Sequence, residues 1–361
     1  MDMSSFNKGR SKRDVRIELL RLLCCFFVVA LHCKPGSNVD GAPSFDRYLF
    51  SNIIADPVSI FLMITGFYFL NEERYAKTVG KNIKRIFLPM ISYIVILLAY
   101  GKGFSSIEAA KSSLLSIGKS IITWTPFIHN SGHLWYLYVH LLLIVLSPLI
   151  KYFLKHIRKN KCLEYGTLIL SLGLFWINDY FSNHLFRCSQ IPITSLLPAI
   201  LLVIIGSTLF HIFDMYLFLH KLSMLYLGAF IGFNIYRASL LTNGEIQMSD
   251  ATFSFIGVLC AVFIVLFFLS LPAIKGQAAE CINLLASFTL GIYIWHVLIM
   301  EIIGTIGLRT WFISLITDGS ETTSVYLRYT ILYSLLIMVI CAIWSMLLRL
   351  INLLIVKLIH Q

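Results

Sequence analysis

Long apolar stretches alternate with short polar segments along the whole chain. Most of these stretches run apolar for about twenty residues, the length that one helix needs to cross the hydrocarbon of a bilayer. The alternation of single apolar and polar residues that is typical of β-barrel strands does not occur. The pattern predicts an all-α polytopic membrane protein with ten transmembrane helices, near residues 16–33, 52–70, 86–101, 133–154, 163–181, 193–213, 216–236, 252–271, 282–308 and 326–357.

One further stretch, residues 105–123, is less apolar because Lys111 and Lys119 interrupt it. A helix with charges on one side and apolar residues on the other is typical of the membrane interface. We therefore expect an amphipathic interfacial helix here. If this stretch spanned the bilayer instead, every later loop would change sides.

The positive charges decide the predicted orientation. The chain contains 29 Lys and Arg. With the amino terminus inside, 19 of them fall in inner segments and 9 in outer loops, and Arg21 lies within the first span. An excess of Lys and Arg is typical of cytoplasmic segments. We expect both termini in the cytoplasm, residues 1–15 as a basic cytoplasmic segment and residues 16–361 as one transmembrane domain.

Composition agrees with this class and excludes others. Hydrophobic residues make up 58% of the chain and charged residues 13%, whereas about a quarter of a soluble domain is charged. The net charge of +11 lies in short loops between apolar runs, so no nucleic-acid partner is expected. The eight cysteines form no C-x-x-C pair and are expected as small core residues. The sequence leaves undecided whether Cys33 and Cys188 form a disulfide.

The first span contains the clearest candidate chemistry, namely Glu18, Arg21 and His32. Ionisable groups within spans are costly, so each is a candidate functional residue. The eleven residues from Arg21 to His32 return a helix to within about 20° of the same face, about 16 Å further along its axis. Both side chains would then lie along one path, or lane, through the interior of the helix bundle from one membrane surface toward the other. The alternative is that Glu18 and Arg21 form a pair at the inner interface and that His32 is a structural histidine at the helix end.

A basic cluster precedes the third span. Lys81 and Arg85 share a helix face, with Lys84 beside them and Pro89 following where a helix can bend. The cluster is suited to the headgroups of membrane lipids, or, together with Arg21, to an anionic ligand that carries phosphates.

Two later spans add aromatic and histidine residues. The fourth span begins with His133, Trp135 and Tyr136, and the ninth contains Tyr293 and His296. Aromatic belts at the membrane interface explain such residues equally well, and a structural histidine bonded to a neighbouring helix is an alternative for His296. In the second span, which Asp56 and Pro57 begin, we expect Gly66 to let another helix approach closely.

Five segments in order resemble the acyltransferase-3 family of bacterial membrane O-acyltransferases. Glu18, Arg21 and His32 have the spacing of the family's first-span signature. The other segments are residues 60–67, with Thr65 where the family has Ser, and residues 82–89, 133–137 and 293–296. In the third span Asn82 stands where the family has its first arginine, so Lys81 or Lys84 would have to supply that charge.

The resemblance implies an enzyme of the bacterial cytoplasmic membrane. Such enzymes take an acyl group, usually acetyl, from cytoplasmic acyl-coenzyme A and place it on a hydroxyl of an extracytoplasmic or lipid-linked glycan. Acyl-coenzyme A is then a donor substrate, and no permanently bound cofactor is expected. No metal is expected either, because the histidines lack ligand spacing with carboxylates.

The residues themselves fit this reaction. Arg21 with Lys81, Lys84 and Arg85 would bind the phosphates of coenzyme A, Glu18 would orient Arg21, and His32 would accept the proton of the attacking hydroxyl. His296, Trp135 or Tyr136 would hold the acceptor or the developing oxyanion. His133 and Tyr293 are expected as further substrate-binding or supporting residues. The competing class is a transporter of amino acids or glycans, in which charged residues along a lane are equally expected.

Overall fold

The computed structural model describes residues 14–35, 38–39, 42–71, 75–101, 106–123, 131–181, 195–246, 253–316 and 322–359. Most of the predicted basic segment 1–15 lies outside these ranges. The described chain is helical apart from one antiparallel pair of two-residue strands, β1 (Asn38–Val39) and β2 (Ala42–Pro43). The helices are α1 (Val15–Cys33), α2 (Phe45–Ile53), α3 (Pro57–Asn71), α4 (Tyr75–Tyr100), α5 (Ile107–Ile122), α6 (Trp135–Ile157), α7 (Lys161–Tyr180), α8 (Leu196–Met215), α9 (Ser223–Thr242), α10 (Phe255–Ser270), α11 (Gly276–Ala286), α12 (Thr289–Thr305), α13 (Leu308–Ile316) and α14 (Thr323–Ile359).

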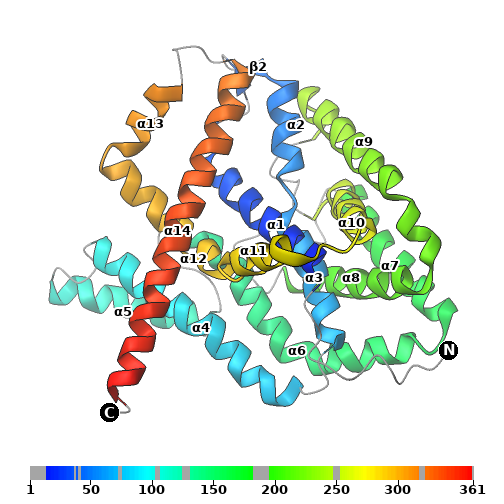
Figure 1. Cartoon of the computed structure of the whole chain (residues 1–361), viewed down its shortest axis with the longest axis horizontal. Helices are drawn as coiled ribbons and strands as arrows, with labels where there is room; N and C mark the ends of the chain where they lie inside the picture. Colours follow the sequence, from blue (N-terminus) through cyan, green and yellow to red (C-terminus); the bar gives the residue numbers. More distant parts are fainter. Residues whose placement is uncertain are drawn as a thin grey trace.

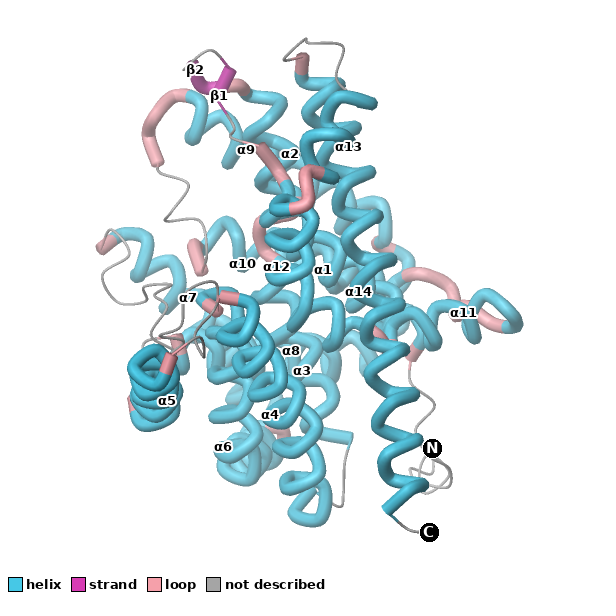
Figure 2. The backbone as a smooth tube through the Cα atoms, turned by 90° about the vertical axis from the view of Figure 1, so that its left-hand side faces the viewer, coloured by secondary structure: helices cyan, strands magenta, loops and turns pink. Residues whose placement is uncertain are grey.

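Helix α1 lies at the centre of the bundle (Figure 1). It packs against α3, α10, α11, α12 and α14. Helix α4 packs against α6 and α12, so α12 is a neighbour of both α1 and α4. Helix α14 runs from the end of the molecule that holds α2, α13 and the strand pair to the opposite end (Figure 2). The central position of α1 brings its ionisable residues into contact with several helices.

Helices occupy all ten ranges that the apolar pattern predicts, but they differ in length and apolarity. In the part of the chain that the structure describes, six helical segments are long and apolar enough to cross a membrane, or seven if α11 and α12 form one bent span. Helix α10 has only 16 residues, and α1 carries Arg16, Glu18 and Arg21. The chain is a polytopic membrane protein. The number ten and the cytoplasmic placement of both termini stay predictions.

Two predicted spans are broken in the structure. The second is divided into α2 and α3, because Asp56 precedes Pro57 and a residue before proline is disfavoured in the helical conformation. Pro57 is the first residue of α3, the position where a missing N–H costs nothing. The ninth, predicted as one helix over residues 282–308, is bent by 49° between α11 and α12. The ninth predicted span is thus a bent pair of helices, whereas α2 and α3 together still form one candidate span, Phe45–Tyr68.

Helices α3 and α8 approach each other closely through two glycines. A Cβ atom placed on Gly66 would lie 2.1 Å from the carbonyl oxygen of Val203. One placed on Gly206 would lie 2.3 Å from the carbonyl oxygen of Met63. The close helix approach expected at Gly66 is therefore confirmed, and Gly206 is its counterpart on the facing helix.

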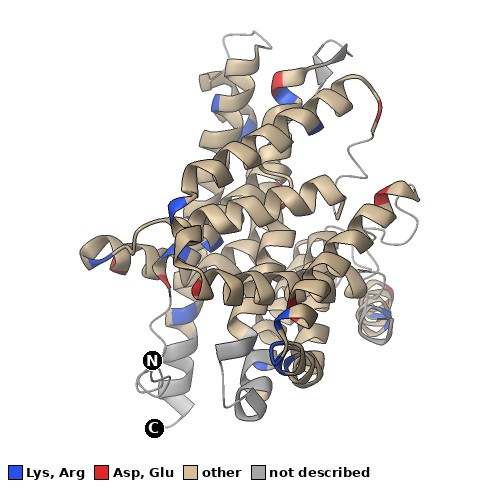
Figure 3. Ribbon diagram, turned by 90° about the vertical axis from the view of Figure 1, so that its right-hand side faces the viewer, with Lys and Arg blue, Asp and Glu red and all other residues tan. Residues whose placement is uncertain are grey.

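Helix α5 corresponds to the predicted interfacial stretch. It lies beside the bundle and is seen nearly end-on in Figure 2. Its charged Lys111 and Lys119 are exposed, as are Leu114 and Leu115, whereas Ser113 is buried. Charged residues are sparse along most of the other helices (Figure 3). Whether α5 lies at the interface stays a prediction.

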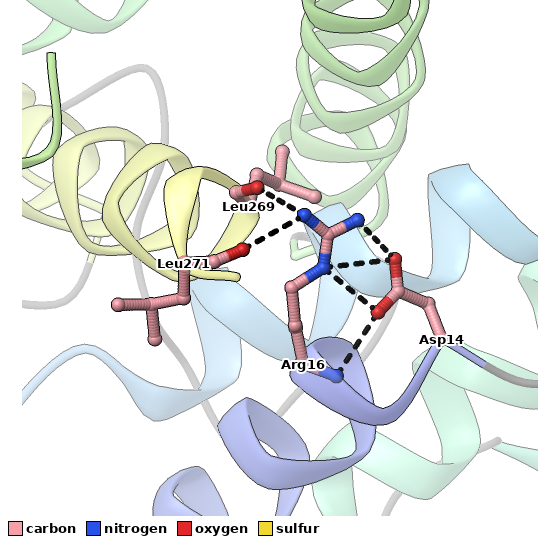
Figure 4. A network of polar contacts seen from close by, with 4 residues as sticks. All are labelled: Asp14, Arg16, Leu269 and Leu271. Atoms are coloured by element: carbon pink, nitrogen blue, oxygen red, sulfur yellow. Dashed lines mark hydrogen bonds and ion pairs between the residues drawn. The ribbon is translucent and has the colours of Figure 1, made fainter. Parts of the chain in front are cut away.

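The first turn of α1 is fixed by a polar network (Figure 4). The Asp14 carboxylate caps the helix by accepting from the backbone N–H of Arg16, at 3.0 Å. The Arg16 guanidinium forms an ion pair with Asp14, at 2.6 Å, and donates to the carbonyl oxygens of Leu269 and Leu271. A cation at the carboxyl end of α10 offsets the unpaired carbonyls there. The network joins the beginning of α1 to the end of α10.

Candidate active site

Helix α1 runs alongside α12 in the same chain direction, from the end of α11 onward. The Arg21 guanidinium donates to the carbonyl oxygen of Ala286 at 2.7 Å, and the Cys25 thiol contacts that of Thr289 at 3.6 Å. Further along, the Cys33 sulfur lies 3.8 Å from that of Met300. Residue numbers increase in the same direction on both sides of this contact, so successive turns of α1 meet first the end of α11 and then successive turns of α12.

Three histidines meet at the far end of this contact. The ring of His296 on α12 lies 5.0 Å, between centroids, from the ring of His32 on α1. It also lies 5.0 Å from the ring of His133, which belongs to the 3₁₀ turn Gly132–Leu134 before α6. The rings of His32 and His133 are 6.3 Å apart. The structure thus brings together histidines from three of the sequence motifs.

These histidines differ in exposure. The side chain of His296 is fully buried, at 0% exposure, and His133 is 9% exposed. His32 is exposed although it packs against both of them. Of the three imidazoles, His32 is therefore the one that a bound molecule can reach.

Backbone carbonyls fix the protonation pattern of the two buried rings. His296 Nδ1 lies 2.7 Å from the carbonyl oxygen of Tyr293, and His133 Nε2 lies 3.2 Å from that of Ile294. A carbonyl oxygen only accepts, so each of these nitrogens carries the proton in the neutral ring. The other nitrogen of each ring is then an acceptor. In this state neither buried histidine can donate a hydrogen bond to an oxyanion, which was one role considered for His296.

Aromatic rings enclose the three histidines. Tyr93 of α4 packs against His133 at 5.3 Å and against Trp295 at 5.5 Å. Tyr136 packs against Tyr293 at 5.7 Å, and the Tyr293 hydroxyl donates to the backbone carbonyl of His133. The sequence motifs did not single out Tyr93. A tyrosine eight residues after Arg85, the last residue of the basic cluster, carries no signal of its own in an apolar helix.

Trp135 has other neighbours. Its ring packs edge-on against Phe253, with centroids 6.2 Å apart. Phe253 precedes α10 and has a positive φ of 66°. Trp135 therefore borders the site from the side of α10. Among the described residues, its ring does not pack against the three histidine rings.

A buried carboxylate and a cation lie at the other end of the contact between α1 and the α11–α12 pair. Glu18 is fully buried and forms an ion pair with Arg21, with an N–O distance of 2.7 Å. The Tyr68 hydroxyl donates to the other oxygen of Glu18 at 2.8 Å. Arg21 is held between Glu18 and the carbonyl of Ala286, the last residue of α11. Because α1 is one continuous helix, about 16 Å of helix axis separate Arg21 from His32.

A second arginine reaches the same break between α11 and α12. The Arg349 guanidinium of α14 donates to the carbonyl oxygen of Ser287 and lies 4.7 Å from the ring centroid of Phe288. Arg21 and Arg349 thus bind the carbonyls of consecutive residues, Ala286 and Ser287. Sequence reasoning missed Arg349, because a lone arginine near the end of an apolar helix is normally read as a topology signal.

The basic cluster of α4 lies on a different helix surface. Lys84 and Arg85 are exposed on a helix that packs against α6 and α12, and Pro89 lies inside that helix. The side chain of Lys81 lies outside the described residues. The described contacts do not join this cluster to Arg21, whose polar partners are Glu18 and Ala286.

Two remaining expectations concern sulfur and metals. Cys33 is buried, and its proposed disulfide partner Cys188 lies outside the described residues. Within the described ranges, no three His, Cys, Asp or Glu side chains are placed to hold a metal ion. Two of the three clustered histidines use a ring nitrogen for a backbone carbonyl.

Apolar helices that enclose a buried ion pair and a histidine cluster define a polytopic membrane protein with an intramembrane polar site. Residues 14–350 match the family described as an acyltransferase domain, the acyltransferase-3 family. The chain belongs to this family and is a membrane acyltransferase. No curated protein and no solved structure matches the chain.

Proposed function

We propose that the protein transfers an acyl group, namely acetyl, from acetyl-coenzyme A to a hydroxyl of an extracytoplasmic or lipid-linked glycan. One observation carries the proposal. An arginine and an exposed histidine face the same helix pair, α11–α12, from positions eleven residues apart on α1. Coenzyme A has a phosphate-bearing head and a long thin arm that ends in the thioester, so it requires cations at one end and a proton acceptor at the other.

His32 is proposed as the general base. Its neutral imidazole accepts the proton of the acceptor hydroxyl while the hydroxyl oxygen attacks the thioester carbonyl. The carbon–sulfur bond then breaks, and the imidazolium returns the proton to the leaving thiolate. The products are an ester and free coenzyme A. General base catalysis of this kind contributes about 10²–10⁴-fold.

Arg21 is proposed to contact the phosphates of the donor. Glu18 and Ala286 hold its guanidinium in place, which lowers the entropy lost when a ligand binds. Arg349 reaches the same break and adds a second cation. Lys81, Lys84 and Arg85 of α4 are proposed to contact the outer part of the head, where exposed side chains adapt to a charged ligand.

The residues around His32 are proposed to hold the acceptor. Tyr136 and Tyr293 pack against each other and His133 lies beside His32, while Trp135 borders the site from α10. Sugars bind well to aromatic surfaces with a few polar groups because their carbon faces are apolar and their edges are polar. We place the protein in the bacterial cytoplasmic membrane, with the donor on the cytoplasmic side.

The test compares membranes from the source strain with and without the gene. Membrane vesicles receive acetyl-coenzyme A labelled in the acetyl group, and base-labile ester is measured in the lipid and polysaccharide fractions. Gene-dependent ester formation supports the proposal. Unchanged ester formation, together with gene-dependent movement of an amino acid or a glycan across the vesicle membrane, would overturn it in favour of a transporter.

A further inference from the structure

We infer that His296 is a positioning residue for His32, a role that rests on the proposed function of His32 as general base. His296 would accept a hydrogen bond from one ring nitrogen of His32. The other nitrogen of His32 would then be free of its proton and would face the acceptor hydroxyl. The two histidines would form a pair of fixed polarity inside the bundle.

The first observation is the tautomer of His296. Its Nδ1 donates to the carbonyl oxygen of Tyr293, three residues earlier on the same helix, at 2.7 Å. Its Nε2 is therefore an acceptor in the neutral ring. Within the described residues this fully buried nitrogen has no hydrogen-bond partner. A buried acceptor without a partner costs free energy, so a donor is expected to approach it.

The second observation concerns which neighbour can be that donor. The rings of His32 and His133 both lie 5.0 Å from the ring of His296. A neutral imidazole has one N–H, and His133 directs its own toward the carbonyl of Ile294 at 3.2 Å. His32 makes no such backbone bond among the described residues. Of the two histidines, only His32 has a proton to offer to His296.

The third observation is that His32 has room to turn. It is exposed and is the next-to-last residue of α1, so the ring contacts that a rotation would change are those with His133 and His296. At a centroid separation of 5.0 Å, such a rotation brings a ring nitrogen of His32 toward His296 Nε2. Hydrogen bonds between catalytic groups are often long in the ligand-free state and shorten when substrate binds.

His296 would orient His32 in the way that the third residue of a hydrolase triad orients the general base. During the reaction the acceptor proton moves to the bare nitrogen of His32 and then to the departing thiolate. The bond from His32 to His296 persists throughout, and His296 itself neither gains nor loses a proton. His296 therefore contributes by holding the tautomer and angle of His32.

Two substitutions separate this role from a structural one. The side-chain amide nitrogen of His296→Asn occupies the place of Nδ1, so this variant retains the bond to the Tyr293 carbonyl but removes the acceptor at Nε2. The side-chain oxygen of His296→Gln reaches the place of Nε2 and retains that acceptor. We expect His296→Asn to lower kcat about 10- to 100-fold with little change in the KM for acetyl-coenzyme A, and His296→Gln to retain activity within about threefold.

Matched controls are His220→Asn and His220→Gln. His220 packs against Phe213 and lies in the 3₁₀ turn Leu217–Lys221, so both controls are expected to retain wild-type kcat. Thermal unfolding in detergent shows whether each variant is folded. Equal kcat in the two His296 variants, or higher kcat in the Asn variant, overturns the inference.

A further variant keeps the inference distinct from the proposed function. If His32→Ala retains ester formation, the general-base role fails, and the inference fails with it. If His32→Ala is inactive while His296→Asn has wild-type kcat, the proposed function stands and only the positioning role is lost. Ester is measured with acetyl-labelled acetyl-coenzyme A in vesicles, as described above.

Discussion

The ring of His32 lies 5.0 Å from the ring of His296, although one residue belongs to α1 and the other to α12. The contact follows because α1 and α12 lie side by side in the same chain direction, beginning at the α11–α12 break. The same arrangement places Arg21 against Ala286. His32, the proposed general base, thus lies at one end of this contact. Arg21, which is proposed to bind the phosphates of the donor, lies at the other end.

Removal of the imidazole of His32 is expected to abolish acylation. His32→Ala should lower ester formation by at least tenfold, because the hydroxyl loses its proton acceptor. Binding of acetyl-coenzyme A, measured by isothermal calorimetry in detergent, should be unchanged. His220→Ala, which removes a histidine from a distant turn, is the control. Turnover of His32→Ala above a tenth of the wild-type value would contradict the assignment.

Removal of the arginines at the α11–α12 break is expected to weaken donor binding. Arg21→Ala and Arg349→Ala should each raise the Kd for acetyl-coenzyme A by one to two factors of ten, since a charge-assisted hydrogen bond contributes about 1.5–3 kcal/mol. The control is Arg328→Ala, because the Arg328 side chain is exposed and, among the described residues, its guanidinium hydrogen-bonds only to Ser324. If Arg21→Ala, Arg349→Ala and Arg328→Ala have the same Kd, Arg21 and Arg349 do not bind the donor. Their role is then limited to bonding the carbonyls at the end of α11.

The cluster of α4 gives a separate prediction. Lys81→Ala, Lys84→Ala and Arg85→Ala are compared by the same binding measurement. Arg85→Ala is expected to raise the Kd for acetyl-coenzyme A. One of the two lysine variants should do so as well if, as proposed, a lysine supplies the charge that Asn82 does not. Wild-type affinity in all three variants would mean that the cluster serves lipid headgroups and topology.

The close packing of α3 and α8 predicts a large effect of one methyl group. Gly66→Ala would place a Cβ 2.1 Å from the carbonyl oxygen of Val203, so the helices must separate at a cost of about 1–3 kcal/mol. A lower midpoint of thermal unfolding in detergent is the expected result. Gly228→Ala on α9 is the control, because nothing lies within 4 Å of its Cβ position. Similar midpoints for both variants would contradict the packing.

The predicted orientation is tested by labelling of single cysteines in a cysteine-free variant. Ser112 is an exposed residue of α5, so Ser112→Cys should react with an impermeant thiol reagent added to intact cells. Ser11→Cys and Asn160→Cys should react only after lysis, since the inner segments hold most of the Lys and Arg. Reaction of Asn160→Cys in intact cells would mean that residues 105–123 span the membrane.

The sequence by itself determined the class of protein and which ionisable residues of α1 share a helix face. Apolar runs of about twenty residues require helices in a bilayer, because backbone groups in hydrocarbon must bond within their own segment. The relation between Arg21 and His32 was also predictable, since helical periodicity fixes which residues of one helix share a face. The structure agrees, because both residues contact the α11–α12 pair.

Only the tertiary structure decided how distant segments meet. The grouping of His32, His133 and His296, the approach of Arg349 to Ser287 and the contact of Tyr93 with His133 join helices far apart in the sequence. Local periodicity indicates the face of a helix that is buried but not the helix that covers it. The hydrogen bonds that set the tautomer of each buried histidine depend on carbonyls whose positions follow from that packing, so no single segment of sequence specifies them.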